Sequence, residues 1–351
     1  MFSLDGFVKC VQKKGLNLYA VIVTKDGERL GEHHWRSDLR MNIHSLSKSF
    51  TSCAVGMALE EGLIHSLDDR VIDYFPDKLD AEPSQWLRKM TIRCLLTMSS
   101  GHEKPLLMGN TRDELEDTDW VHYFLNQPLC REPGTLFLYD TGCTFLVSAI
   151  LEKQSGQHLV QYLKPRLFDP LGIRNPQWFT SPDGIALGGG GLHLNCDEIT
   201  RFAQMLLDGG VYKGERLVPE AYLKQATAKQ IDNAGQGDWG MGYGFQFWRC
   251  VWPGAYRGDG AYGQFALILP EQNAHICITS HEERSIADIL DSVWEEIAPQ
   301  LRAAGRERCE ENGWKHTHDG DVQIPLGAVD AARRFHQRKA QLSHRQVPGP
   351  V

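Results

Sequence analysis

The sequence lacks the marks of several protein classes. Its nine cysteines are an odd number, with no C-x-x-C pair and no spacing typical of zinc sites, so we expect reduced thiols and neither disulfides nor metal ligands. No stretch approaches the roughly 18–20 uninterrupted apolar residues of a transmembrane helix. Internal repeats and low-complexity tracts are also absent from the sequence. These absences disfavour a disulfide-stapled, zinc-binding, membrane-spanning or repeat protein.

Basic residues are in the minority, because 37 Lys and Arg stand against 45 Asp and Glu and give a formal net charge of −8. This balance disfavours nucleic acid as a partner, since polyanions are held by distributed positive charge. With 42% hydrophobic and 23% charged residues, the 351-residue chain has the composition of a globular protein. Asp5 and Lys9 interrupt the apolar run that an N-terminal secretion signal needs. We therefore expect a cytoplasmic protein without a membrane partner.

The order of strand-like and helix-like segments predicts an α+β fold of the α/β sandwich type. A D-G turn between β-forming residues predicts a hairpin over 16–35. Short apolar runs predict strands over 243–248, 263–269 and 275–280. Helical spacing predicts a buried helix from Ser45 to Gly62 and a long helix over 285–301. An antiparallel sheet built from both chain ends, flanked by helices, pairs all these strands.

The chain is expected to have two interleaved parts and a tail. Residues 1–70 and 235–302 form the predicted sheet region, and residues 71–234 form a mainly helical region. Its candidate helices lie over 91–98, 119–126, 143–155, 158–164, 195–207 and 219–228. Residues 303–351 are polar, end in Pro-Gly-Pro-Val and are predicted to be a C-terminal extension.

The sequence Ser45-Leu46-Ser47-Lys48 is the one S-x-x-K in the chain. Spacing of three places the Ser45 hydroxyl and the Lys48 amine on one helical face, about 5–6 Å apart at Cβ. A serine becomes a nucleophile when a base takes its proton, and a lysine among apolar groups has a lowered pKa that frees its amine for this task. The helix N-terminus favours an oxyanion. The bare tetrapeptide also fits a capping serine followed by a solvated lysine, so its surroundings matter.

Further motifs precede and follow this tetrapeptide. They lie over 44–52, 61–64, 67–71, 74–76, 91–102, 133–134, 139–142, 168–173, 188–192 and 262–265. These motifs closely resemble those of the serine β-lactamase-like hydrolase family and follow one another in the same order, over about residues 15–300. That family includes class C β-lactamases, D-amino-acid peptidases and carboxylesterases. The resemblance implies that family's fold, with no cofactor and no metal.

The resemblance also implies roles for single residues. Ser45 would be acylated and Lys48 would be its partner base. The second motif of the family, Y-x-N, corresponds to Tyr139-Asp140-Thr141. Its tyrosine relays protons, a role that a phenol fills when cations lower its pKa. Thr141, a candidate substrate-binding residue, departs from the family's asparagine, reaches less far and offers one donor instead of two, which argues against β-lactam hydrolysis.

The third family motif, K-T-G or H-x-G, normally lies on a strand beside the nucleophile, and its candidate here is the segment 256–261. If Gly260 takes the place of the motif glycine, the Ala261 N–H joins the Ser45 N–H as an oxyanion hole. Arg257 is a candidate for holding a substrate carboxylate, and Asp259 for holding an amine or repelling an anion. The alternative is that Arg257 and Asp259 pair with each other or face solvent.

These residues predict a serine hydrolase that forms an acyl-enzyme on Ser45 and cleaves an ester or amide bond of a small molecule or short peptide. A non-catalytic binding or scaffolding protein with the same fold is the alternative. The sequence lacks the G-x-S-x-G of α/β-hydrolases, and the glycines at 188–191 lack the lysine of a phosphate loop and are expected to pack beside the active site. Trp239, Trp248 and Trp252 either line an apolar acyl pocket or belong to the core.

Overall fold

A computed structural model of the chain describes residues 1–302, and the predicted C-terminal extension over 303–351 lies outside the described residues. The helices are α1 (Asp5–Lys14), α2 (Ser47–Glu60), α3 (Val71–Tyr74), α4 (Ile92–Leu96), α5 (Gly109–Asp113), α6 (Trp120–Asn126), α7 (Thr141–Ser155), α8 (Leu159–Leu163), α9 (Cys196–Leu207), α10 (Glu220–Thr227) and α11 (Ile286–Glu296). The strands are β1 (Leu18–Lys25), β2 (Glu28–His34), β3 (Met41–Asn42), β4 (Gln177–Trp178), β5 (Leu192–Leu194), β6 (Val211–Tyr212), β7 (Glu215–Arg216), β8 (Trp248–Arg249), β9 (Tyr256–Gly260), β10 (Gln264–Leu269) and β11 (Ala274–Ser280). A short 3-10 helix, η1 (His44–Leu46), directly precedes α2.

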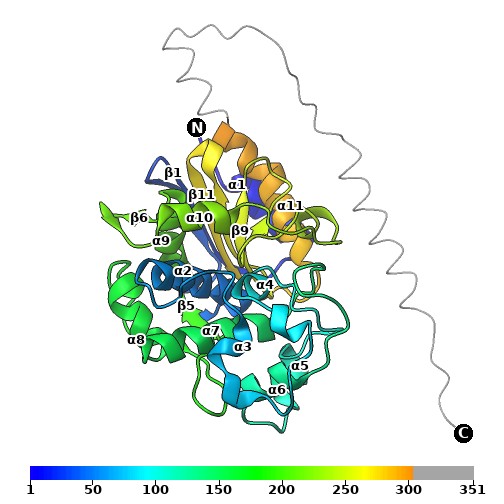
Figure 1. Ribbon diagram of the computed structural model, residues 1–351. Coiled ribbons are helices and arrows are strands. Elements are labelled where there is room, and N and C mark those ends of the chain that lie inside the picture. The colour runs from blue at the N-terminus through cyan, green and yellow to red at the C-terminus, as the bar shows by residue number, and fades with distance from the viewer. Residues whose placement is uncertain (303–351) are drawn as a thin grey trace, which may run out of the picture.

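The main sheet has the strand order β2-β1-β11-β10-β9-β8, and all its neighbouring strands run antiparallel. Strand β1 pairs with β11, so that Val21 lies opposite Ile278 and the two ends of the chain meet in one sheet. Figure 1 shows β1 and β11 side by side, with the inserted helices α3, α5, α6, α7 and α8 below them. The predicted α+β fold, with an antiparallel sheet built from both chain ends, is confirmed.

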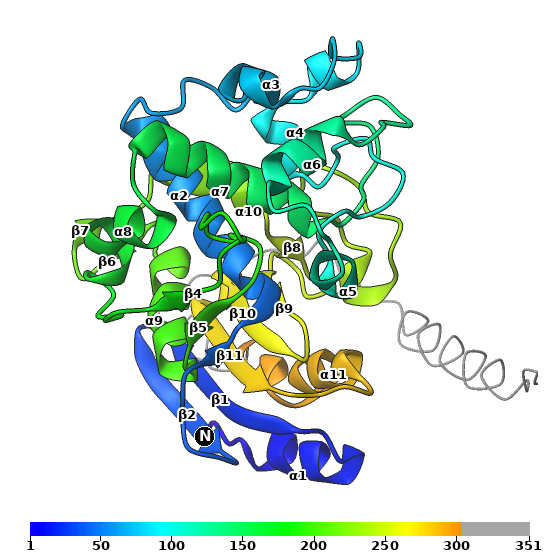
Figure 2. The same cartoon turned by 90° about the horizontal axis from the view of Figure 1, so that it is seen from below.

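The two faces of the sheet enter separate hydrophobic cores, because successive residues of a strand point to opposite sides. On one face, Val23 and Leu267 pack against α1 and α11. On the other face, Ile22 and Ile268 belong to the core that includes α2, α7 and α9. Figure 2 shows α1 and α11 on one side of the strands and α9 on the other. The sheet thus separates the helical region from the pair formed by α1 and α11.

Helix α2 lies where the sheet meets the helical region, and its residues 47–58 are all buried. It contacts β9, α7 and α10. Phe50 stacks on Phe202 of α9 with 3.7 Å between ring centroids. Gly56 lies so close to the ring of Tyr222 in α10 that a Cβ there would be 2.5 Å from it. The helix that begins just after Ser45 is therefore held on several sides.

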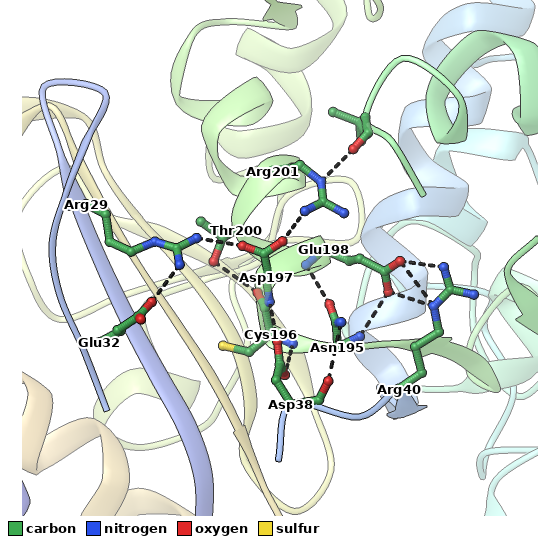
Figure 3. A network of polar contacts seen from close by, with 11 residues as sticks. Arg29, Glu32, Asp38, Arg40, Asn195, Cys196, Asp197, Glu198, Thr200 and Arg201 are labelled. Atoms are coloured by element: carbon green, nitrogen blue, oxygen red, sulfur yellow. Dashed lines mark hydrogen bonds and ion pairs between the residues drawn. The ribbon is translucent and has the colours of Figure 1, made fainter. Parts of the chain in front are cut away.

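A network of polar contacts fastens the segment that leads to Ser45 onto the start of α9 (Figure 3). The carboxylate of Asp38 accepts hydrogen bonds of 2.9 and 3.2 Å from two backbone N–H groups at this helix end. The guanidinium of Arg40 forms an ion pair with the buried carboxylate of Glu198. Carboxylates are stabilised at a helix N-terminus, where free N–H groups and the helix dipole attract them. The chain is thus fixed just before it enters β3 and η1.

Some local predictions differ from the structure. The helix predicted from Ser45 begins at Ser47, after η1. The strand predicted over 243–248 is wrong, since β8 consists of Trp248–Arg249. The backbone turns at Gln246, which has φ +67° and whose side-chain amide donates to the carbonyl of Leu96 at 2.8 Å. Helix α1 had no predicted counterpart, and the predicted domain boundaries stay predictions. None of the helices in residues 1–302 combines the length and apolar character that a membrane crossing requires.

Candidate active site

Ser45 lies in η1, partly exposed, at the N-terminal end of the buried helix. The residue before it, His44, has a left-handed backbone with φ +49°. The side-chain oxygen of Asn42 accepts hydrogen bonds from the N–H groups of His44, at 2.8 Å, and Gly191, at 3.1 Å. The hydroxyl of Ser47 donates to the carbonyl of His44 at 2.6 Å. These bonds fix the backbone on both sides of the candidate nucleophile.

Lys48 extends from the first turn of α2 back toward Ser45. Its Nζ is 3.0 Å from the Ser45 Oγ, 3.1 Å from the Thr141 Oγ1 and 2.6 Å from the carbonyl oxygen of Gly189. Lys48 is 1% exposed. A neutral amine has two N–H donors and one lone pair. It can therefore donate to Gly189 and Thr141 and still accept the proton of Ser45.

The charged form of Lys48 is disfavoured in these surroundings. Burial lowers the pKa of Lys48 to about 7, while the nearby Asp140 and Cys143 raise it and Arg112 lowers it. Arg112 itself pairs with Asp113 at 3.3 Å. No carboxylate in residues 1–302 forms an ion pair with Lys48. The amine is therefore close to half neutral at pH 7, as a general base requires.

Tyr139 directly precedes α7, whose first turn is capped by Asp140 through a 2.8 Å hydrogen bond from the Gly142 N–H. The Lys48 Nζ lies 5.0 Å from the centroid of the Tyr139 ring. Burial raises the pKa of Tyr139 well above its usual range, and a hydrogen bond with Ser45 lowers it by less. The guanidinium of Arg257 lowers this pKa, as expected of a cation, but burial outweighs it and the net shift is upward. Because burial disfavours the phenolate, Tyr139 stays a protonated phenol that can donate to a leaving group.

Thr141 begins α7 and contacts Lys48 through its hydroxyl. The hydroxyl also lies 3.1 Å from the sulfur of Met108. Although a threonine reaches less far than an asparagine, it reaches the lysine here because α7 starts beside α2. Its hydrogen bonds are directed to the protein, so Thr141 is placed to orient Lys48.

The candidate third motif lies on β9, and its glycines face η1. A Cβ on Gly258 would lie 2.2 Å from the Leu46 Cδ1, and one on Gly260 would lie 2.2 Å from the carbonyl oxygen of Ile43. At Gly260 only glycine permits this approach of two backbones, whereas at Gly258 the close neighbour is a side chain. The next residue, Ala261, is exposed at the start of the turn to β10. This register supports the assignment of Gly260 as the motif glycine.

Arg257 and Asp259 alternate with these glycines and therefore point to the opposite face of β9. The Arg257 Nε lies 2.9 Å from a carboxylate oxygen of Asp259, and Arg257 is 0% exposed. Its guanidinium also lies over the rings of Trp239 and Trp248, at 5.0 and 5.7 Å. The structure thus shows the alternative in which these two residues pair. This argues against Arg257 as the residue that holds a substrate carboxylate, because its buried guanidinium is already paired, while the assignment of Asp259 to substrate binding stays a prediction.

Four contributors to the site were missed by the sequence interpretation: the Gly189 carbonyl, the Asn42 side chain, Asp140 and Met108. The expectation that the glycines at 188–191 pack beside the active site is confirmed, since a Cβ on Gly189 would lie 3.1 Å from the Lys48 Nζ. An aspartate just before a helix is a usual N-cap, which was the available signal for Asp140. Nothing in the local sequence marks Asn42 or Met108.

The tryptophans near the third motif divide between two environments. Trp248 lies 5.4 Å from Tyr139, ring centroid to ring centroid. Trp252 stacks on Trp294 of α11 and belongs to the core on the other face of the sheet. Within residues 1–302, no group of three or more His, Cys, Asp or Glu side chains is arranged to hold a metal ion.

The sheet from both chain ends, the helical insert and the site between them define a β-lactamase-like protein with a serine and lysine at its centre. The family model described as Beta-lactamase matches residues 7–291. The chain therefore belongs to the β-lactamase family, and the resemblance noted in the sequence is confirmed.

Individual relatives are more distant. Lovastatin esterase of Penicillium rubens is 28% identical over 160 residues, which cover 39% of this chain and 39% of the relative. The 6-aminohexanoate-dimer hydrolase of Paenarthrobacter ureafaciens is 24% identical over 224 residues, covering 60% of this chain and 57% of the relative. The chain thus spans less than two thirds of the length of these relatives. The octameric penicillin-binding protein homologue from Pyrococcus abyssi shares the fold, with a TM-score of 0.67 at 19% identity, over 86% of this chain and 79% of that one.

Proposed function

We propose that this chain is a serine hydrolase that forms an acyl-enzyme on Ser45. The observation that carries the proposal is the 3.0 Å contact between the buried amine of Lys48 and the Oγ of Ser45. An amine whose pKa lies near 7 can take the hydroxyl proton without a large free-energy cost at neutral pH. Membership of the β-lactamase family supports the same chemistry.

In acylation, Lys48 accepts the proton of Ser45 while the Oγ forms a bond to the substrate carbonyl carbon. The carbonyl oxygen becomes an oxyanion, which receives hydrogen bonds from the N–H groups of Ser45 and Ala261. As the tetrahedral intermediate collapses, the bond to the leaving group breaks and the phenol of Tyr139 gives the leaving atom its proton. The proton held by Lys48 then returns to Tyr139.

In deacylation, a water molecule takes the place of the leaving group. Lys48, assisted by Tyr139, accepts a proton from this water as its oxygen bonds to the acyl carbon. The second tetrahedral intermediate expels the Ser45 Oγ, which recovers its proton from the lysine. The net reaction is hydrolysis of an ester or amide, and it consumes one water.

The proposed substrate is an ester or amide of a small molecule or short peptide with an uncharged, apolar acyl group. The ring of Tyr139 packs among those of Phe137, Tyr243 and Trp248, at 5.4 to 6.4 Å, and the half-buried Phe137 supports an apolar environment on this side of the site. Arg257, the cation on the third motif, is already neutralised by Asp259. The names of the two curated relatives, an esterase and a dimer hydrolase, fit this class. A cytoplasmic location is part of the proposal.

The test is covalent labelling with a fluorophosphonate probe, read by intact mass spectrometry. The wild-type protein should gain one probe mass, and Ser45→Ala should gain none. Ser49→Ala is the matched control, since Ser49 is a buried serine of the same helix whose hydroxyl bonds to the Gln246 carbonyl, away from Lys48. Absence of an adduct on folded wild-type protein would refute the enzyme and favour the non-catalytic alternative.

The substrate class is tested on the same preparations. We expect p-nitrophenyl butyrate to be hydrolysed faster than the p-nitrophenyl ester of D-alanine, which has the same leaving group but carries a charge next to the reacting carbonyl. A chromogenic cephalosporin, whose carboxylate lies near the lactam, should also be turned over more slowly. Faster turnover of either charged substrate would contradict the uncharged acyl group while leaving the role of Ser45 intact.

A further inference from the structure

The two segments that supply the oxyanion donors pass through non-glycine residues with left-handed backbones. His44, just before Ser45, has φ +49°, and Tyr262, just after Ala261, has φ +64°. For residues other than glycine this region is sparsely populated, and bulky side chains are held there only by their surroundings. The strain therefore lies at the two positions that orient the candidate N–H donors.

These two segments come from distant parts of the chain and meet at one point. The carbonyl of Ile43 lies against Gly260 so closely that a Cβ on the glycine would be 2.2 Å from it. The rings of His44 and Tyr262 meet edge to face, with 5.0 Å between their centroids. Each strained residue thus contacts the other across the gap between η1 and the β9–β10 turn.

Tyr262 is also held by residues at the end of β11 and just after it. Its carbonyl accepts a 3.0 Å hydrogen bond from the N–H of Glu282 and a further bond from the hydroxyl of Ser280. His281 stacks on its ring, with 4.5 Å between centroids and an interplanar angle of 15°. The phenol ring is therefore held between two imidazoles, one of them adjacent to the candidate nucleophile.

His44 makes its contact as a neutral ring. Burial lowers the pKa of His44 to about 4, with smaller contributions in the same direction from His281 and His193. At neutral pH the imidazole is not a cation that could itself attract an oxyanion. Any contribution that it makes to catalysis must come from the geometry that its ring enforces.

We propose that His44 and Tyr262 are positioning residues whose ring contact holds the N–H groups of Ser45 and Ala261 in register as an oxyanion hole. The inference rests on the proposed function. Removing an oxyanion donor outright typically lowers kcat about 10²–10³-fold. Because the donors remain present and lose only their alignment, loss of the ring contact should lower kcat about 10–100-fold and leave KM within about twofold.

The experiment compares removal of the ring, together with the strained conformation that it holds, with retention of both. Tyr262→Gly removes the ring and relieves the strained conformation, whereas Tyr262→Phe keeps the ring. His44→Gly and His44→Phe form the same comparison on the other side. Lys213→Gly is the matched control, since Lys213 has φ +49° in the turn between β6 and β7 and lies in none of the contacts described above.

Two readouts are used, both normalised to active sites titrated with the fluorophosphonate probe. One is the kcat and KM for p-nitrophenyl butyrate. The other is the inhibition constant of phenylboronic acid, in which the Ser45 Oγ bonds to boron and a boron hydroxyl occupies the oxyanion position. We expect Tyr262→Gly and His44→Gly to lower kcat and weaken the boronate by similar factors, and both Phe variants to keep most of the wild-type values.

Several results would overturn the inference. Wild-type kcat and boronate affinity in Tyr262→Gly would mean that the ring does not position the donors. A raised KM at unchanged kcat would make the ring a substrate contact instead. A lowered melting temperature with unchanged kcat would make the ring merely structural. If Tyr262→Gly does not fold, the comparison of His44→Gly with His44→Phe tests the inference instead. Failure of the wild-type protein to label would refute the proposed function itself, and the inference with it.

Discussion

The rate of acylation should rise with pH through the pKa of Lys48. Only the neutral amine can accept the proton of Ser45, and burial places the pKa of Lys48 at about 7. The neutral fraction is then about 1% at pH 5, about half at pH 7 and about 99% at pH 9. The rate should therefore increase about 100-fold from pH 5 to pH 9, with a slope of about tenfold per pH unit below pH 6.

The titration of neighbouring groups does not obscure this inflection in the rate of acylation. The pKa of His44 is lowered by burial to about 4, so its titration is nearly complete at pH 5. The pKa of Tyr139 is raised by burial, so the phenol keeps its proton over the whole range. A lysine with the ordinary pKa of 10.5 would give a rate that is still rising tenfold per unit at pH 9.

The assay is the second-order rate constant for inactivation by the fluorophosphonate, measured at half-unit steps from pH 5 to pH 9. Inactivation reports attack by Ser45 without product release, and it avoids the spontaneous hydrolysis of activated esters at high pH. Circular dichroism at each pH confirms that the protein stays folded. A rate that is flat from pH 6 to pH 9, or an inflection above pH 9, would refute Lys48 as the base.

Two further predictions concern packing and stability. Gly189→Ala should lower kcat/KM at least about tenfold, because its Cβ would lie 2.8 Å from Thr141 and 3.1 Å from the Lys48 Nζ. The matched control is Gly190→Ala, whose Cβ would have its nearest contact at 3.6 Å and whose activity should stay near that of the wild type. Equal activities of the two variants would contradict the packing around Gly189. Glu198→Gln should lower the free energy of unfolding, measured in urea, by about 1–3 kcal/mol. The substitution removes the charge-assisted pair with Arg40, in which the side chain of Glu198 is only 6% exposed. The exposed pair Lys89–Glu132 is the control, and Glu132→Gln should cost less than about 1 kcal/mol.

The parts of the site that sequence could predict are those fixed by local periodicity. Spacing of three along a helix brought Ser45 and Lys48 within reach of each other, although the serine itself lies in η1. Alternation along β9 would also have placed Arg257 away from the nucleophile, because residues 257 and 260 of one strand lie on opposite faces. Only the family resemblance placed the segment 256–261 on a strand, and Arg257 was assigned a role by its charge without regard to which face of that strand it occupies.

Other parts depend on contacts that no local pattern contains. The Gly189 carbonyl that fixes the lysine comes from a turn 141 residues away. The strand predicted over 243–248 has an apolar pattern typical of β-structure, yet Gln246 turns the backbone because its amide finds partners on α4 and α7. A buried side-chain amide needs its hydrogen bonds, and satisfying them outweighs the strand propensity of the neighbouring residues.

Burial shifts the pKa of both basic and acidic side chains around Ser45. Removing a group from water disfavours its charged form, so it lowers the pKa of Lys48 and His44 and raises the pKa of Tyr139. Near pH 7 this leaves an amine that can accept a proton, a phenol that can donate one and an imidazole that does neither. Acyl transfer needs the first two together, one to activate the nucleophile and one to serve the leaving group. The residue types can be read from the sequence, whereas their protonation states follow from the packing of α2 against the sheet and α7.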